Sequence, residues 1–425
     1  MSVGKYLARY REPEARLAEL IPEEYAALLV VPALGESPEL IEGYRGAAKA
    51  LRGGRLLVAL VVNARANAAP ELAARNHELL KAFERGRELP RARLFSDPDF
   101  DVLAIDRASR GNELPPKQGV GLARKIGMDL GLALYARGKL RSPWLFGTDA
   151  DARLPPDYFS RVEQAPEGVS AVLYPFRHAG DASDPVTQAT WRYEASLRYH
   201  VLGLASAGSA YAHHSVGSAI AVRAELYAGV RGVPKREAGE DFYLLDKLVK
   251  LAPLARLTGE PLELRARHSS RAPFGTGPGV SAVLEQGDAL VPHPRSFARL
   301  REISDAIDEL ARTRDFPAFR ALLANFEVYA FLHGLGMFEA YERAVREVGS
   351  GNLRRRLITW FDGQRTLRVL HALGAHGLPE IELARALDRA PFTPGCGGLE
   401  TEALLERLTR FELALPALAG PALEE

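Results

Sequence analysis

Short apolar runs alternate with longer stretches of helical periodicity through the first half of the chain. The apolar runs carry few polar residues on either face, as in RLLVALVVN at 55–63, which is typical of strands buried between two layers. We therefore expect an α/β fold with a mostly parallel sheet flanked by helices. The predicted strands are one within 27–37 that stops at Pro32, and others at 55–63, 100–106, 144–151 and 169–176; the predicted helices are 4–20, 38–51, 70–85 and 118–138.

The pattern changes in the last third of the chain, where almost all of the sequence has helical periodicity. We therefore expect an α/β domain over 1–282, beginning with an amphipathic helix at about 4–20, and a helical C-terminal region over 283–425. Ligands of mostly parallel sheets bind outside the carboxyl ends of the strands. Residues 33–36, Asn63 and residues 149–151 follow predicted strands, so they are the first candidates for a binding site.

Composition narrows the class of protein. The 425 residues carry a formal net charge of +1, so no strong field attracts nucleic acid or an anionic membrane. Cys396 is the only cysteine, which excludes a disulfide framework and a cysteine-based zinc site. No apolar run reaches the roughly 18 residues of a membrane-spanning helix, and the N-terminus lacks a signal-peptide core. We expect a cytoplasmic protein with no transmembrane segment and no nucleic-acid partner.

The clearest candidate chemistry lies in LFGTDADARLPPDYF, where a buried strand ends at Asp149 and Asp151. A bend at the strand end brings two such carboxylates to one site, and carboxylate oxygens are the ligands that Mg²⁺ and Mn²⁺ prefer. These cations usually keep a phosphate as a co-ligand, so the pattern favours a site for a phosphorylated substrate. The alternative interpretation is a polar turn with an aspartate cap.

Five segments together resemble family 2-type nucleotide-sugar glycosyltransferases of the GT-A fold, in the order found in that family. The resemblance covers roughly residues 27 to 250, and each segment alone is weak evidence. The segments are LLVVPALGES, GVGLARKIGMDLGLA, LFGTDADARLPPDYF, SVGSAIAVRAELYAGVRGVP and AGEDFYLLDKLVK.

Two positions depart from the family pattern. Gly35 stands where the family usually has asparagine, and the second strand ends in VVNARAN rather than D-D-G-S. The contact with the nucleotide base would then fall to Asn63, whose amide offers different donors from a carboxylate. The identity of the base is left open.

The resemblance implies a nucleotide-sugar site at the carboxyl ends of the strands. Asp149 should lie near the ribose, and Asp151 should hold Mn²⁺ or Mg²⁺. His268 would complete the metal shell, because neutral imidazole is a suitable ligand; alternatively it is a solvated loop residue. Either Arg124 or Lys125 would contact the nucleotide, and the alternative for Lys125 is a surface position. The full implied nucleotide-sugar set is Pro32, Ala33, Leu34, Glu36, Asn63, Arg124, Asp149, Ala150 and Arg271, of which Glu36 has a helix cap as its alternative role.

Glu240 and Asp241 form the predicted catalytic element. Gly239 precedes them and the following residues have helical spacing, which places both acids at a helix N-terminus where the helix dipole favours their ionised forms. The resemblance makes Asp241 the base that takes the proton from the acceptor hydroxyl, with Glu240 helping to hold the acceptor. Ordinary first-turn acidity of a surface helix is the alternative. Candidates for the acceptor pocket are Arg177, His178 and His214.

The function implied by the resemblance is metal-dependent transfer of a sugar from a nucleoside-diphosphate sugar to an acceptor hydroxyl, with inversion in a single displacement. Two alternatives stay open: a retaining GT-A transferase acting on a small soluble acid, and a protein that binds a nucleotide sugar without catalysis. Nucleotidyl transfer is disfavoured, because PALGESPEL has one glycine and no basic residue after the first strand. The acceptor and the donor sugar are left open.

Overall fold

The computed structural model describes residues 1–268 and 275–421 and divides into two compact units. The first unit is built mainly from Met1–Ala179 and Ser215–Arg265, and the second mainly from Gly180–His214 and the chain from Thr276 onward. The sequence predicted a single boundary after residue 282. The helical C-terminal region falls in the second unit, together with a long helix from the middle of the chain.

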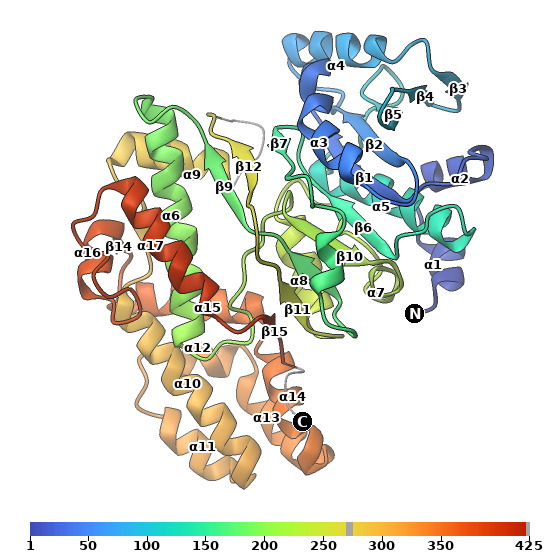
Figure 1. Ribbon diagram of the computed structural model, residues 1–425. Helices are drawn as coiled ribbons and strands as arrows, with labels where there is room; N and C mark the ends of the chain where they lie inside the picture. The colour runs from blue at the N-terminus through green and yellow to red at the C-terminus, as the bar shows by residue number, and fades with distance from the viewer. Residues whose placement is uncertain (269–274, 422–425) are drawn as a thin grey trace. The chain divides into compact units, whose positions relative to one another are not determined.

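A large, mostly parallel sheet flanked by helices forms the first unit (Figure 1), as the alternation of apolar and amphipathic runs predicted. Its strands run in the order β11-β8-β10-β6-β1-β2-β5-β4-β3, and β10 is antiparallel to both of its neighbours. The strands are β1 Ala27–Ala33, β2 Leu56–Asn63, β3 Arg87–Leu89, β4 Ala92–Ser96, β5 Asp101–Arg107, β6 Trp144–Gly147, β8 Ala171–Leu173, β10 Ile220–Arg223 and β11 Leu254–Arg256; a small separate sheet holds β7 Ala152–Arg153, β9 Phe176–Ala179 and β12 Leu262–Arg265.

The helix α5, Val120–Ala136, packs directly on the central strands and is buried over most of its length. Two glycines allow this close approach. A Cβ at Gly127 would lie 2.3 Å from Val30 of β1, and one at Gly131 would lie 2.9 Å from Leu145 of β6. The other helices of this unit are α1 Val3–Arg9, η1 Pro13–Arg16, α2 Leu17–Leu20, η2 Pro38–Ile41, α3 Glu42–Ala50, α4 Pro70–Ala82, η3 Arg161–Gln164, α7 Ala224–Gly229 and α8 Glu240–Leu248.

The predicted helix at 4–20 is interrupted, so that expectation was wrong in its extent. Helix α1 ends at Arg9 because Pro13 has no N–H to continue the helical hydrogen bonds. The backbone N–H of Glu12 instead donates to Asp129 of α5 at 2.8 Å. The prediction that Pro32 stops the first strand was also wrong: β1 continues to Ala33, since its pairing with β6 ends at Val30 and leaves Pro32 beyond that ladder.

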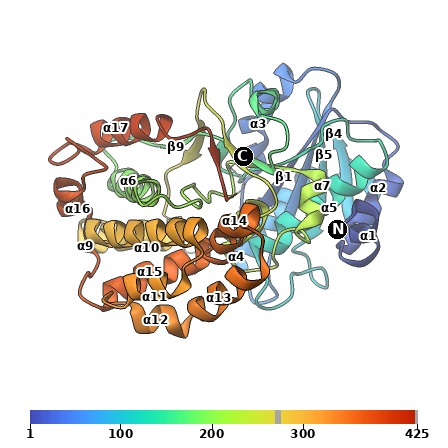
Figure 2. The ribbon, with the colours of Figure 1, turned by 90° about the horizontal axis from the view of Figure 1, so that it is seen from below.

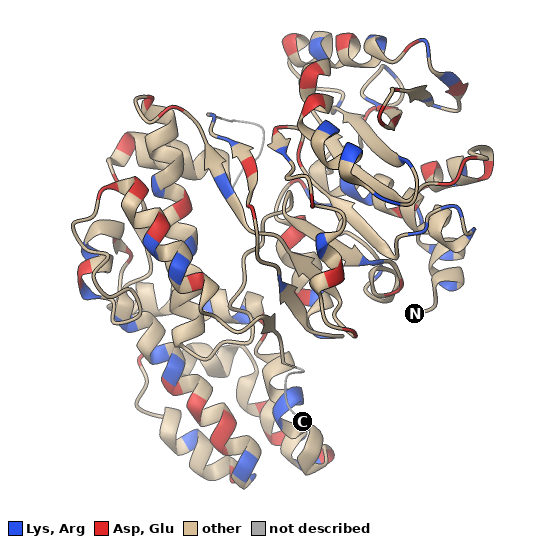
Figure 3. Ribbon diagram, viewed as in Figure 1, with Lys and Arg blue, Asp and Glu red and all other residues tan. Residues whose placement is uncertain are grey.

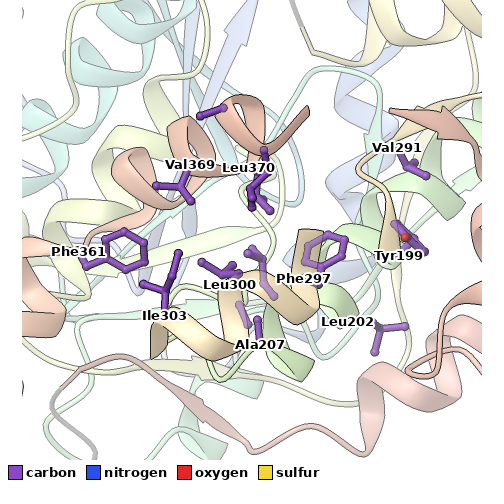
Figure 4. Packing of buried hydrophobic residues seen from close by; sticks show 14 of the residues in the cluster. Tyr199, Leu202, Ala207, Val291, Phe297, Leu300, Ile303, Phe361, Val369 and Leu370 are labelled. Atoms are coloured by element: carbon purple, nitrogen blue, oxygen red, sulfur yellow. The ribbon is translucent and has the colours of Figure 1, made fainter. Parts of the chain in front are cut away.

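The second unit is almost entirely helical, with a core of apolar side chains such as Phe297, Leu300 and Leu370 (Figure 4). Helix α10 lies between α6 and α15, and α17 packs on α6 (Figure 2). Its elements are α6 Pro185–Ser206, α9 Thr276–Gln286, β13 Leu290–Val291, α10 Pro294–Thr313, α11 Phe316–Leu323, α12 Tyr329–Gly334, α13 Met337–Glu347, α14 Ser350–Trp360, α15 Gly363–Ala375, β14 Ile381–Glu382, α16 Leu383–Arg389, α17 Thr401–Leu413 and β15 Leu418–Ala419.

A charged contact holds α17 on α6. Glu412 of α17 accepts a hydrogen bond from Arg198 of α6 and lies 2.7 Å from Nε2 of His214. Burial alone would raise the pKa of the Glu412 carboxyl, but His214 and Arg198 outweigh burial and lower that pKa. The contact therefore stabilises the unit at neutral pH and is lost as the pH falls through the lowered pKa of Glu412.

We expect the substitution Glu412→Gln to loosen α17 without unfolding the unit. Losing hydrogen bonds to a charged partner costs about 2 kcal/mol, which corresponds to about 30-fold faster amide exchange in this helix. Hydrogen–deuterium exchange over Thr401–Leu413 measures the effect. Glu406→Gln is the matched control, because Glu406 forms an exposed pair with Arg410 of the same helix. Equal exchange in both variants would contradict the expectation.

Candidate functional site

Two aspartates follow β6 at the carboxyl end of the sheet, where the sequence predicted them. The N–H of Thr148 donates to Val30 of β1 at 3.0 Å, so the chain stays attached to the sheet just before the acidic segment. The N–H of Ala152 then donates to the carbonyl of Asp149 at 3.2 Å, which closes a turn over the acidic segment. Ala150 is buried in this turn, whereas Asp149 and Asp151 are partly exposed.

Tyr44 of α3 lies close to three carboxylates, Glu36, Asp149 and Asp151, which we call the acidic cluster. Its hydroxyl donates to the carbonyl of Asp149 at 3.2 Å. Burial raises the pKa of Tyr44 most, and the negative charges of Asp151, Asp149 and Glu36 raise it further. The structure therefore gathers Glu36, which follows β1, with the two aspartates that follow β6. Sequence reasoning missed Tyr44, because nothing in its local pattern distinguishes it from a core tyrosine.

Arg124 contacts both acidic motifs, the pair Asp149 and Asp151 through Asp149 and the pair Glu240 and Asp241 through Glu240. This side chain of α5 is 3% exposed, and its Nε donates to Glu240 Oε1 at 2.8 Å. Its Nη2 donates to Asp149 Oδ1 at 2.5 Å and its Nη1 to the carbonyl of Thr148 at 3.3 Å. Gly217 leaves room for the guanidinium, since a Cβ there would lie 2.7 Å from Nη2. One buried cation thus joins Asp149 and Glu240, which lie far apart in the sequence.

Glu240 and Asp241 begin α8, as the sequence predicted. Gly239 precedes the helix with a φ of 70°, a conformation that glycine adopts without strain. The Glu240 side chain is buried against Arg124, while Asp241 is partly buried and its Oδ1 accepts the N–H of Phe242 at 2.7 Å. Burial first, and then the charge of Glu240, raise the pKa of Asp241 to about 7, although Arg124 acts in the opposite direction. Asp241 is therefore poised to exchange a proton near neutral pH.

Several side chains predicted to line the nucleotide pocket are buried, so only some of them are accessible to a ligand. Pro32 and Ala33 are buried at the end of β1, whereas Leu34 is partly exposed. Asn63 is 6% exposed, and its amide donates to the carbonyls of Ala33 and Val61 at 3.0 and 3.2 Å. In this structure Asn63 joins the ends of β1 and β2, so both of its donors are already used by the backbone.

Lys125 neither meets the predicted nucleotide site nor lies on the surface, so both expectations for it were wrong. Its ammonium is buried 2.7 Å from Asp129 Oδ2 and 2.5 Å from the hydroxyl of Tyr6. The other carboxylate oxygen of Asp129 accepts the hydroxyls of Tyr6 and Tyr227 at 2.6 and 2.7 Å. This network fixes α1 against the helix that carries Arg124.

Of the remaining candidates that the structure describes, two belong to the first unit and two to the second. Arg177 is exposed on β9 and pairs with Glu263 of β12, whereas the next residue, His178, is buried. His214 belongs to the second unit, where it contacts Glu412. His268 also belongs to that unit, and its Nε2 lies 3.0 Å from Ser281 Oγ. Arg271 lies outside the described residues, so its predicted role stays a prediction.

The donor set suits a hard divalent cation that keeps substrate oxygens as ligands. Among residues 1–268 and 275–421, no cluster of three His, Cys, Asp or Glu side chains is arranged to hold a metal ion alone. Mg²⁺ and Mn²⁺ do not require one, because they are commonly held by one or two carboxylates together with phosphate and water oxygens. Asp149 and Asp151, at the exposed side of an acidic cluster, fit that requirement.

Comparison with known proteins gives no family for this chain. No protein-family model matches it, and no curated protein matches it. Within the part of the chain that the structure describes, no helix is both long enough and apolar enough to span a membrane.

Proposed function

We propose that the first unit is a glycosyltransferase domain of the GT-A fold, which transfers a sugar from a nucleoside-diphosphate sugar to an acceptor hydroxyl. The observation that carries the proposal is the convergence of two acidic motifs on Arg124 at the carboxyl end of the sheet. Surface acids and helix caps would not require a buried cation between them. The resemblance to family 2-type transferases assigns both motifs to one active site, and their shared contact with Arg124 supports that assignment.

In the proposed reaction, Asp241 accepts the proton of the acceptor hydroxyl as the acceptor oxygen attacks the anomeric carbon. The bond between that carbon and the diphosphate oxygen breaks in the same step, so the configuration inverts. Asp149 and Asp151 would hold Mn²⁺ or Mg²⁺, which neutralises charge on the departing diphosphate. Glu240 is too buried against Arg124 to contact an acceptor, so we assign it a positioning role instead. NMR of the product anomer separates inversion from retention.

The proposal is tested by thermal denaturation with UDP-, GDP- and ADP-sugars, with and without Mn²⁺. A ligand at about 100 times its Kd stabilises the folded state by about 2.7 kcal/mol, which raises the melting temperature by several degrees. We expect at least one donor to do so, and Mn²⁺ to increase the shift in the native protein but not in Asp151→Asn. Asp181→Asn is a matched control on an exposed turn. No shift with any donor would refute the proposal, and a metal-dependent shift retained in Asp151→Asn would refute the metal assignment.

A further inference from the structure

Three cations form a second charged feature, which we call the basic cluster: Arg231 and Arg236, which precede α8, and Lys247, which lies in the last turn of this helix. All three are exposed. Elsewhere, basic and acidic residues are interspersed along the chain of both units (Figure 3), and many form ion pairs. Within residues 1–268 and 275–421, none of the three forms an ion pair with a carboxylate. The basic cluster therefore carries charge that the described protein leaves unneutralised.

The two lysines beside the basic cluster show the opposite behaviour. Lys235 lies 2.7 Å from Glu12, and Lys250 lies 2.7 Å from Asp246. The fold thus supplies acids to these two lysines but not to the three cations of the basic cluster. A solvated surface stretch would not require this distinction, whereas an anion site does.

The guanidinium groups of the basic cluster are held in place by aromatic rings. Arg236 Cζ lies 3.7 Å from the ring centre of Tyr243, and Arg231 Cζ lies 5.3 Å from that of Tyr10. Arg231 also has a φ of 66°, a backbone conformation that residues other than glycine rarely adopt. A strained residue that keeps its charge suggests that the charge has a use.

Arg236 stacks on Tyr243, which lies one helical turn before Lys247 on α8, so the charges of Arg236 and Lys247 lie on the same side of this helix. Burial lowers the pKa of Lys247 most, and the charges of Arg236 and Arg231 lower it further. Asp246 acts in the opposite direction, but it is already paired with Lys250. Bringing a multiply charged anion to this position would relieve the repulsion.

We propose that Arg231, Arg236 and Lys247 bind a small phosphate-bearing anion. Planar guanidinium groups match phosphate oxygens in pairs, and lysine adds a compact third charge. A phosphate group carries close to two negative charges at neutral pH, which suits three cations better than a single carboxylate does. This site involves none of the residues assigned to sugar transfer, so it is independent of the proposed function.

Binding of inorganic phosphate and of pyrophosphate to the full chain, measured by calorimetry at constant ionic strength in chloride, tests the proposal. We expect saturable binding that Arg236→Gln and Lys247→Gln each weaken about tenfold or more, with pyrophosphate bound more tightly than phosphate. Arg312→Gln is the matched control, because it removes the same charge from an exposed pair in the second unit.

Arg231→Gly guards against misfolding as an explanation. Glycine suits the backbone at this position, so the variant should melt at the same temperature as the native protein or higher, yet lose phosphate affinity. The proposal is overturned if neither anion binds, if Arg312→Gln weakens binding as much as the cluster variants, or if only vesicles containing phosphatidic acid bind.

Discussion

Replacing Arg124 by methionine should destabilise the first unit by about 3–5 kcal/mol and abolish sugar transfer. The reason is that Glu240 would remain buried without its cation, and an uncompensated buried charge is more costly than the loss of a pair. Asp149 loses the same partner but is 41% exposed, so water takes over much of its stabilisation. Amide exchange over β1 and β6 measures the stability of this unit separately from the second.

Two further variants separate stability from chemistry in this prediction. Adding Glu240→Gln to Arg124→Met removes the unpaired charge, so most of the stability should return while transfer does not. Arg107→Met is the control, because Arg107 forms a buried pair with Glu14, which belongs to neither acidic motif. It should lower stability and leave turnover unchanged. Full stability in the Arg124→Met single variant would contradict the assigned role of the buried cation.

The positions of strands and helices near the site were predictable because they depend on local patterns. An apolar run gives β2 at 56–63, and a glycine followed by helical spacing gives α8. The placement of ligand chemistry at the carboxyl ends follows from parallel topology alone. Hence the gathering of Glu36 with Asp149 and Asp151 could be expected from sequence.

The partners of individual side chains could not be predicted, since they depend on contacts distant in sequence. Arg124 and Lys125 are adjacent and chemically alike, yet one joins the acidic cluster and the other a separate buried network around Asp129. Helical rotation of about 100° per residue separates them, but only the packing of α5 decides which side faces the site. The sequence around Asn63 likewise gives no sign that its side-chain amide donates to backbone carbonyls of β1 and of its own strand.

Elements with weak local signals were also missed. The hairpin of β3 and β4 is short and only partly buried, so it lacks the apolar run that identifies the central strands. Helix α6 carries charged residues such as Glu194 and Arg198 in its buried face, which masks its amphipathic pattern. These residues are buried because they pair with each other, a compensation that sequence periodicity does not reveal.

The acidic cluster and Arg124 also set the state of Asp241. Asp149, Glu240 and Asp241 all lie near the one buried cation, Arg124. Asp241 therefore ionises against burial and against the negative charges of the other two. Its pKa of about 7 makes it a proton acceptor of suitable strength at neutral pH. We therefore expect kcat/KM to rise with pH through about 7 as Asp241 loses its proton.

Asp241→Asn should lower kcat by about 10²–10⁴-fold, the usual contribution of a general base, while donor binding stays within a few-fold of the native value. Asp246→Asn is the control, since Asp246 lies on the same helix but pairs with Lys250. Unchanged turnover in Asp241→Asn would refute the assignment of Asp241 as the base. Loss of donor binding instead would move Asp241 from acceptor activation to the nucleotide site.

The substitution Asp241→Asn should also change how the free energy of unfolding depends on pH, and the raised pKa of Asp241 fixes the sign of that change. The folded state raises the pKa of Asp241 from 3.8 to about 7, so between these values it binds a proton that the unfolded chain has released. The native protein should therefore lose stability as the pH rises from about 4 to about 7, and Asp241→Asn should lack this decline. Melting temperatures across that range, compared with Asp246→Asn, measure the difference. If the asparagine variant is no more stable than the native protein at pH 8, then Asp241 is ionised without penalty in the fold, and the proposed proton transfer near neutrality loses its physical basis.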